Sequence, residues 1–549
     1  MSGLGPGFDR GCKRLGPMTA ARSFKELLLT ATMGALLAGC QHPPRSAPGE
    51  LPESSAARAL STEVRAELPQ VPAQWVNLST ATPGGSPIAD VIPVPSTPAG
   101  DLLPAAWWRL YGDPRLSELV ESALATSPTA KIAKSRVQQA RALAELADAK
   151  TGPRAGWSTS AGRARAAGDA KAETKLDLAL SLNWDLDLGG QAAAASAAAR
   201  LGQQAATAQA DAARLALAAD TAMAWLQLLA MNERLRLQAE SIRNAQAVLN
   251  LLQVQREAGR ASGLDLARQR AQLAEEQAAV APLDLQRKRW HSTLAALLGR
   301  SVYEVPVPHP SAGLDDLTLP PVQPGLPADL LLRRPAVRHA EWRLAQADAN
   351  VMAARAAVLP KLGLDARVGL SARDLAGLAQ PAAWLHGLAL QLAGTLFDGN
   401  GSGDGAARAG IQFAQAEREE RVQAYVQALV DGWREVEDAL ASLEESQRQA
   451  EWLALAVTAS QQAADLAEAR LRLGSADAGL VLEARRQLLA QQHALLQARQ
   501  ARTIDTVTLY RAVAGPWRPA DKDASLCREV SATPSGCAGP ASFLGSTGF

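Results

Sequence analysis

Side chains that could bind a metal ion or act in catalysis are few and scattered in this sequence. None of the six histidines has a second histidine at the HxxH or HxxxH spacing of zinc ligands on one helix. Asp398, Asn400 and Ser402 match three positions of a calcium loop, but the last position, which should be Glu, is Ala409. There is no GxSxG motif, no phosphate-binding P-loop and no GxGxxG after a predicted strand. We therefore expect no metal ion, no cofactor and no enzymatic activity.

A covalent modification is expected near the N-terminus. Arg22 and Lys25 precede an apolar run at residues 27–37, and this run leads into Leu-Ala-Gly-Cys, which ends at Cys40. A charged start, a short apolar run and small residues before the cut are typical of a secretory signal peptide. The run is shorter than the roughly 20 residues of a membrane-spanning helix. Leu-Ala-Gly-Cys is similar to the bacterial lipobox, so we expect Cys40 to carry lipid (palmitate). The alternative is an ordinary signal peptide with an incidental cysteine.

The overall charge excludes one class of partner. The chain of 549 residues has 56 basic and 55 acidic side chains, and no basic stripe stands out along it. Nucleic-acid binding needs such a basic surface, so we expect no nucleic-acid partner. Aromatic residues make up only 4% of the chain, which favours long helices packed through Ala and Leu over a large aromatic core.

Alternating residues predict β-strands. Every even-numbered residue in 176–186 is apolar and every odd-numbered one is polar or small, and residues 361–370 alternate in the same way. Residues 384–397 and 155–165 show the pattern more weakly. A two-residue period gives a strand one apolar and one polar face. Segments of about 10 such residues joined by turns are typical of transmembrane strands. A half-buried strand in a soluble sheet is the alternative.

The strands belong to a duplicated unit. Residues 136–153 and 343–360 are similar Ala-rich helical runs that both end at a proline, and each is followed by a strand pair, a Gly-rich turn and a long helical run. The run at 191–258 contains no proline and would extend about 100 Å as one helix. Four strands cannot close a membrane barrel, which needs about eight, so the chain must assemble with other copies. A coiled-coil scaffold protein is the alternative.

These features predict an order of segments along the chain. The expected segments are an N-terminal extension with a signal peptide (1–39), a lipidated flexible tether (40–100), a first repeat (101–305, strand pair about 154–188), a linker (306–326), a second repeat (327–517, strand pair about 360–397) and a disordered tail (518–549). Cys527 and Cys537 in the tail could form a disulfide in an oxidising compartment or remain free thiols.

Each long helical run is interrupted once by a short Gly-containing segment, at residues 259–265 and 474–480. Glycine favours a turn there, and a Ser or Asp shortly afterwards can cap the next helix. We therefore predict two helix–turn–helix tips. Their candidate residues are Gly259, Ser262, Leu264, Gly474 and Asp477. A plain loop with no binding partner is the alternative.

Several motifs together resemble one known family. They are Trp107-Trp108, Gly112-Asp113-Pro114 with Leu116, the run from Leu330 to Leu364 with Arg333-Arg334-Pro335, Phe397-Asp398-Gly399, and Tyr510-Arg511-Ala512 with Trp517. They extend over roughly residues 101–517. On these motifs the chain resembles the TolC-like outer membrane factor family, in particular its efflux lipoprotein branch (OprM/NodT-like).

The resemblance implies a fold and a function. The fold would be mostly α with transmembrane β: a long antiparallel α-helical barrel plus four strands per chain, which complete a twelve-stranded outer-membrane barrel in a homotrimer. The chain would be the passive exit duct of a tripartite efflux system for small molecules such as drugs or toxic compounds. Its partners would be outer-membrane lipid, a periplasmic adaptor (membrane fusion) protein and an inner-membrane transporter of the RND, MFS or ABC type. The alternatives are a type I protein secretion duct and a periplasmic coiled-coil structural or adaptor lipoprotein.

The resemblance also assigns roles at the tips. Both tips would dock the adaptor, and a periplasmic gate would lie just after the second tip. The gate positions of the family fall on Glu483 and Arg486, with Leu480 nearby. Residues three apart share one face of a helix, so a solvated pair within the helix is the alternative. Gly479 and Leu480 stand where relatives often carry a bulky or acidic residue, and the first repeat has Ala267 and Arg270 at the matching positions.

Overall fold

The computed structural model describes residues 106–164, 173–259, 261–320, 333–394, 405–473, 475 and 478–513. By its internal contacts the chain divides into two units, Met1–Arg65 and Ala66–Phe549, and all described residues belong to the second. Several residues singled out in the sequence lie outside the described part. They are Cys40, Phe397, Asp398, Asn400, Ser402, Gly474, Asp477, Trp517, Cys527 and Cys537.

The described chain is mostly helical and contains four strands. Its long elements follow in the order α4 (Pro114–Thr126), α5 (Pro128–Ala149), β1 (Arg154–Ala164), β2 (Glu173–Asp185), α6 (Gln191–Glu257), α7 (Gly263–Ala278), α8 (Val280–Leu298), α10 (Pro335–Ala356), β3 (Lys361–Ala372), β4 (Trp384–Ala393), α11 (Gly405–Arg472) and α12 (Ala478–Val513). Short 3₁₀ turns include η1 (Trp107–Tyr111), η2 (Val302–Glu304) and η3 (Leu314–Asp316). The prediction of a mostly helical fold with four strands is confirmed.

The motif at residues 112–114 forms the joint between η1 and α4. Gly112 ends η1 in the left-handed conformation (φ 72°), which a residue with a side chain rarely adopts. Asp113 caps α4, because its carboxylate accepts a hydrogen bond from the backbone N–H of Arg115 at 2.8 Å. Pro114 occupies the first helical position, where its missing N–H costs nothing. The indole N–H of Trp225 also donates to Asp113, at 2.7 Å, and this bond ties the joint to α6.

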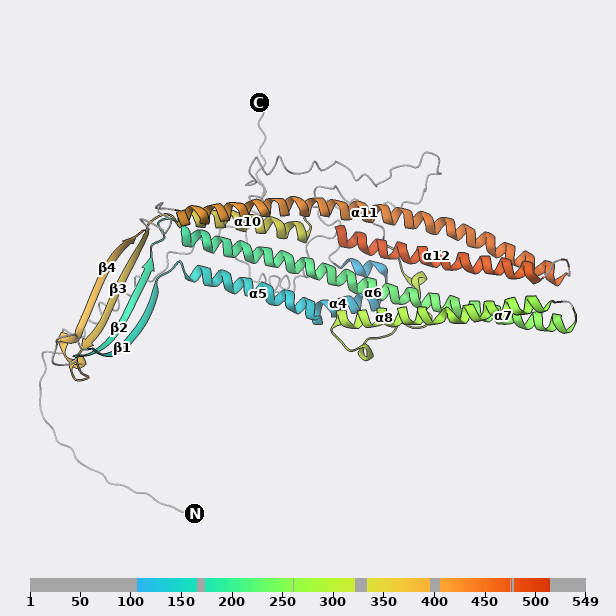
Figure 1. Cartoon of the computed structure of the whole chain (residues 1–549), viewed down its shortest axis with the longest axis horizontal. Coiled ribbons are helices and arrows are strands. Elements are labelled where there is room, and N and C mark those ends of the chain that lie inside the picture. Colours follow the sequence, from blue (N-terminus) through green and yellow to red (C-terminus); the bar gives the residue numbers. More distant parts are fainter. Residues whose placement is uncertain are drawn as a thin grey trace, which may run out of the picture. The chain divides into compact units, whose positions relative to one another are not determined.

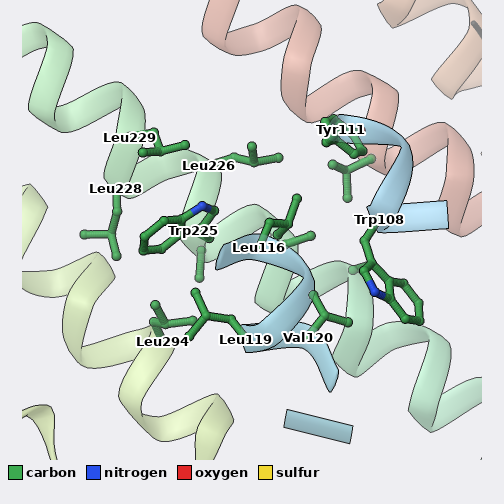
Figure 2. Close-up of a cluster of buried hydrophobic side chains, with 14 of the residues drawn as sticks. Trp108, Tyr111, Leu116, Leu119, Val120, Trp225, Leu226, Leu228, Leu229 and Leu294 are labelled. Carbon is green, nitrogen blue, oxygen red and sulfur yellow. The ribbon is translucent and has the colours of Figure 1, made fainter. Parts of the chain in front are cut away.

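The main hydrophobic core lies where η1 and α4, the first described elements (called the N-terminal segment below), meet the long helices. Trp107 and Tyr111 are almost completely buried, and the ring of Trp107 stacks on that of Tyr510 with centroids 5.4 Å apart. Figure 2 shows Leu116, Leu119 and Val120 of α4 among side chains of α6 and α8. Burial, and next the neighbouring Tyr510, raises the pKa of Tyr111 well above its ordinary value. This core fixes α4 and η1 against α6, α8 and α12.

The longest helices are α6, with 67 residues, and α11, with 68. The proline-free run after Gly190 is one unbroken helix, as its sequence predicts. Figure 1 shows α6 running beside α5 and α10 over its first part and beside α8 and α7 over its second part. The main contacts of α6 are with these four helices and with α12. Helices of this length are stabilised mainly by such neighbours.

The return from the first tip is made by α7 and α8, separated at Ala279. Pro282 lies in the first turn of α8, where a proline breaks no intrahelical hydrogen bond. The long return helix is therefore divided at the point where its sequence places a proline. On the other side, α11 and α12 form the second hairpin and pack along each other.

The four strands form one antiparallel sheet in the order β1-β2-β3-β4. One row across it is Trp157, Leu180, Val368 and His386, each opposite the next. The pairing of β2 with β3 joins the two repeats, and Figure 1 shows all four strands side by side. β1, whose sequence alternates only weakly, is paired with β2 along its whole length.

Candidate functional site

The two faces of the sheet differ in chemistry. The register places the even-numbered residues of β2, β3 and β4 and the odd-numbered residues of β1 on one face. That face is mostly apolar on all four strands, and its polar members are Thr159, Arg163, Thr174 and His386. Its most exposed apolar members are Trp157, Leu178, Leu180, Val368, Trp384, Leu388, Leu390 and Leu392. Such an exposed, mostly apolar face is unfavourable in water and suits contact with lipid.

The opposite face of the sheet is polar. The hydroxyl of Ser160 donates a hydrogen bond to Asp177 at 3.2 Å, and the ammonium of Lys175 lies 3.6 Å from the same carboxylate. Asn183, Asp365 and further polar residues continue this face towards the helices. The sheet is therefore apolar on one side and polar on the other, as the wall of a membrane barrel is.

The sheet has two free edges within the described residues. β1 pairs only with β2, and β4 pairs only with β3. Their outward N–H and C=O groups therefore need a partner from elsewhere, because hydrocarbon provides none.

The first tip lies between α6 and α7. Gly259 has φ 69°, and its surroundings are open. Ser262 caps α7: its hydroxyl accepts from the N–H of Asp265 at 3.1 Å, and its own N–H donates back to the Asp265 carboxylate at 3.2 Å. The hydrogen bond from the Ser262 side chain is the main reason that the pKa of Asp265 is lowered. Leu264, two residues after the cap, is 58% exposed.

The predicted gate residues lie in the first turns of α12. Leu480 is 46% exposed and occupies the position in the second tip that Leu264 occupies in the first. Glu483 and Arg486 are both exposed, and neither forms an ion pair or a side-chain hydrogen bond with any described residue. No ion pair joins Glu483 to Arg486, and the gate role of these two exposed residues stays a prediction. Arg270 in α7, at the matching position of the first repeat, is also exposed.

The structure reveals two contacts at the second tip that sequence reasoning missed. The guanidinium of Arg485 forms an ion pair with the carboxylate of Glu468 in α11. Leu482 packs against a buried cluster of the first hairpin, which contains Leu249, Leu252 and Leu266. The sequence gave no signal for these two contacts, because each joins residues of different helices. The start of α12 is therefore held by its own hairpin and by the first one.

The described residues lack two other features. Among them no group of three or more His, Cys, Asp and Glu side chains is placed to hold a metal ion. No helix among them combines the length and apolar character needed to cross a membrane.

Comparisons with known proteins agree with these features. The family described as Outer membrane efflux protein matches residues 119–300 and 326–515. The pyoverdine export outer membrane protein OpmQ of Pseudomonas putida is 33% identical over 423 residues, covering 75% of this chain and 88% of OpmQ.

Solved structures give the same picture. The crystal structure of CusC, described in terms of transmembrane channel formation, has a TM-score of 0.70 and 25% identity, covering 76% of this chain and 96% of CusC. The outer-membrane channel OprN has a TM-score of 0.69 and 28% identity, covering 76% of this chain and 94% of OprN.

Paired long helices joined to a two-faced set of strands define a class of outer-membrane channel proteins. The chain belongs to the outer membrane efflux protein family, and it functions in efflux at the outer membrane. The resemblance to TolC-like proteins is thereby confirmed.

Proposed function

We propose that this chain is the passive exit duct of a tripartite efflux system, and that three copies assemble into it. The observation that carries the proposal is the sheet, which has one mostly apolar face and whose edges at β1 and β4 have no partner among the described residues. Joining β4 of one copy to β1 of the next pairs both edges and continues the apolar face around a ring.

The number of copies follows from the size of a membrane barrel and from the family. Four strands per chain fall short of the roughly eight that a closed barrel needs, so a single copy is excluded. Two copies would give a barrel of the smallest size, with an interior filled by side chains. Three copies give twelve strands, which leaves room for a passage, and three is the number implied by the TolC-like fold.

The helices would continue this passage into the periplasm. Each chain has two helical hairpins. One consists of α6 with α7 and α8, and the other consists of α11 with α12. In the trimer these hairpins would form a closed helical wall. The two tips, around Gly259, Ser262 and Leu264 and around Gly474 and Asp477, would dock a periplasmic adaptor. An inner-membrane transporter of the RND, MFS or ABC type would supply the energy. The exposed leucines at positions 264 and 480 support docking, because they give each tip a small apolar contact.

The gate would lie at the start of α12. Around a three-fold axis Glu483, Arg486 and Leu480 would each occur three times. Glu483 and Arg486 are exposed and form no ion pair with the described residues, which supports this role, because both remain available for ion pairs with a neighbouring copy. The contacts of Arg485 and Leu482 would hold this part of the helix in place.

The N-terminal region would anchor the duct. We propose cleavage before Cys40, lipidation of that cysteine and a tether leading to the first repeat, with the segment boundaries given by the sequence. The cargo would consist of small molecules, as the name of the pyoverdine export relative suggests. Labelling with radioactive palmitate should mark the wild-type protein and leave Cys40→Ser unlabelled.

Native mass spectrometry of the protein extracted from outer membranes in detergent tests the assembly. The expected mass is three times that of the processed chain, and the unheated trimer should migrate more slowly on gels than the monomer that heating releases. Recovery as a monomer, or release from membranes by carbonate, would overturn the proposed duct in favour of a periplasmic coiled-coil lipoprotein.

A further inference from the structure

A cavity outside the gate and the tips lies among α6, α8 and α12. Its volume is about 490 Å³, which is in the range of small-molecule sites. It is lined by Gln227, Met231, Arg234, Gln286, Arg289, Trp290, Thr293 and Gln500. None of these residues belongs to the motifs from which the function was predicted.

Two arginines give the cavity a positive charge that the chain does not neutralise. Arg234 of α6 and Arg289 of α8 form no ion pair with any described carboxylate. The Nε atom of Arg234 is buried and has no hydrogen-bond partner, and burial lowers the pKa of this guanidinium. A buried donor without a partner is costly, so a ligand that accepts a hydrogen bond from it would be stabilised.

The remaining wall combines amides with an apolar surface. Gln500 is only 9% exposed; its Nε2 donates to the side-chain oxygen of Gln227, while its own Oε1 is buried without a partner. Trp290 and Met231 supply an aromatic and a thioether surface. Polar groups that converge beside an aromatic and a thioether surface suit a small molecule with one charged and one apolar end.

One carboxylate, that of Glu276, acts on the same region as Arg234, and its single charge is smaller than that of the two arginines. Glu276 of α7 accepts hydrogen bonds from Gln272 at 2.7 Å and from Gln238, four residues along α6 from Arg234, at 2.6 Å. His493 of α12 also lies near Arg234 and Glu276, and burial lowers its pKa, which favours the neutral imidazole. The net charge presented to the cavity is therefore positive.

The cavity lies on the side of the helical wall opposite the N-terminal segment. At 100° per residue, Gln227, Met231 and Arg234 share one face of α6. Trp225, which is bonded to Asp113 of the N-terminal segment, and Arg236, which donates to Ser311, lie on the other face. The N-terminal segment and the chain around Ser311 form an additional layer on that other face of α6. In a duct such a layer can lie only outside the helical wall, because inside the wall it would fill the passage. The cavity side therefore corresponds to the inside of the duct.

We propose that this cavity is a binding subsite within the duct for small aromatic carboxylates, with Arg234 and Arg289 binding the carboxylate and Trp290 contacting the ring. Its location inside the duct rests on the proposed function. The binding of the carboxylate rests only on the cavity itself. In the trimer the site would occur three times around the passage and would concentrate anionic cargo there.

The test compares three probes of equal size and different charge. Calorimetric titration of the full-length protein in detergent would use 1-naphthoate, 1-naphthylmethanol and 1-naphthylmethylamine. Naphthoate should bind, and the neutral and cationic probes should bind much more weakly. Arg234→Gln and Arg289→Gln should each weaken naphthoate binding by about tenfold, the usual effect of losing a charge-assisted hydrogen bond.

The chain offers a matched control on the same helix. Arg243 of α6 is exposed and lies nine residues after Arg234, half a turn around the helix axis, so Arg243→Gln removes an equal charge from the other side. This control should bind naphthoate as the wild type does. Equal affinity for the three probes, or equal losses in the Arg234, Arg289 and Arg243 variants, would overturn the carboxylate site.

Conductance separates the two parts of the proposal. In planar bilayers naphthoate should partly block current through the wild type, and Arg289→Gln should need about a tenfold higher concentration for the same block. Binding without any block would overturn the location inside the duct. A trimer that conducts but binds no naphthoate would refute the subsite and leave the proposed duct intact.

Discussion

Arg485 of α12 and Glu468 of α11 form an ion pair that joins the two helices of the second hairpin close to its tip. Both side chains are about one-third exposed, at 32% and 31%, and the Nε atom of Arg485 is buried without a hydrogen-bond partner. The neighbouring Glu483 and Arg486 are exposed and unpaired among the described residues. This ion pair, which links the two helices near the tip, is thus separate from the residues proposed to close the duct.

Glu468→Gln should loosen the second tip. The loss of a partly exposed ion pair costs about 1 kcal/mol or less, so local opening should increase without general unfolding. Hydrogen exchange should become faster in residues 466–473 and 478–488. Glu445→Gln is the control, because it removes a more exposed pair with Arg448 in the same helix. Equal exchange at the tip in both variants would contradict a bracing role.

Replacing Glu483 and Arg486 together by Ala should raise the single-channel conductance in planar bilayers. The change removes the proposed ion pairs between copies and the bulk of two side chains from the passage. Arg270→Ala in the first repeat is the matched control and should leave conductance near the wild-type value. Unchanged conductance of the double variant across the pH range would refute the gate.

Leu180→Lys should strongly reduce the amount of trimer in the outer membrane. The leucine lies on the apolar face, 60% exposed, where a lysine near the bilayer midplane costs about 2–4 kcal/mol. Ser181→Lys puts the same side chain on the polar face and should assemble normally. Trimer yields from matched membrane extracts would show the difference. Equal yields would mean that the even-numbered face does not contact lipid.

Asp113→Ala should lower the thermal stability of the helical part. The variant loses the cap of α4 and the acceptor for the Trp225 indole, which together correspond to about 1–3 kcal/mol. Asp113→Asn keeps one acceptor oxygen, which can still cap α4, but its amide NH₂ cannot accept from the Trp225 indole, so its loss should be intermediate. Thermal unfolding followed by circular dichroism would measure both. Equal losses in the two variants would show that the hydrogen bonds are not the cause.

Stability should decrease as the pH falls below about 6.5. Burial, opposed by Glu276 and reinforced by Arg234, lowers the pKa of His493 from its ordinary 6.5. The unfolded chain therefore takes up this proton at a higher pH than the folded chain does. The contribution is present above pH 6.5 and is lost as the pH falls towards the folded-state pKa. Denaturant titrations at several pH values should show a smaller slope in His493→Gln, and an unchanged slope would refute this cause.

The faces of the sheet were predictable from the sequence, because a strand has a fixed two-residue period. The alternation at residues 176–186 therefore assigned each side chain of β2 to a face before any pairing was known. β1 gave a weak signal, since its Gly and Ala residues alternate poorly. Its face is set by the register, which places Trp157 opposite Leu180.

The contacts between helices were not predictable in this way. Arg485 with Glu468, and the cavity with Arg234 and Arg289, depend on how α6, α8, α11 and α12 are rotated and shifted against one another. A helical period indicates which residues share a face of one helix, but it does not determine which face meets which neighbour. The duplication gave the positions of both tips but no information about this packing.

In the proposed trimer, the outer edges of β1 and β4, which have no partner among the described residues, would make each copy dependent on two neighbours at once. A subunit damaged at one edge would still join a healthy partner through its intact edge. That healthy partner would then be unable to form a closed trimer. If damaged and healthy subunits were made in equal amounts, only about one ring in eight would contain three healthy copies. Lesions confined to one edge strand should therefore act as dominant-negative alleles, whereas lesions that prevent folding altogether should be recessive.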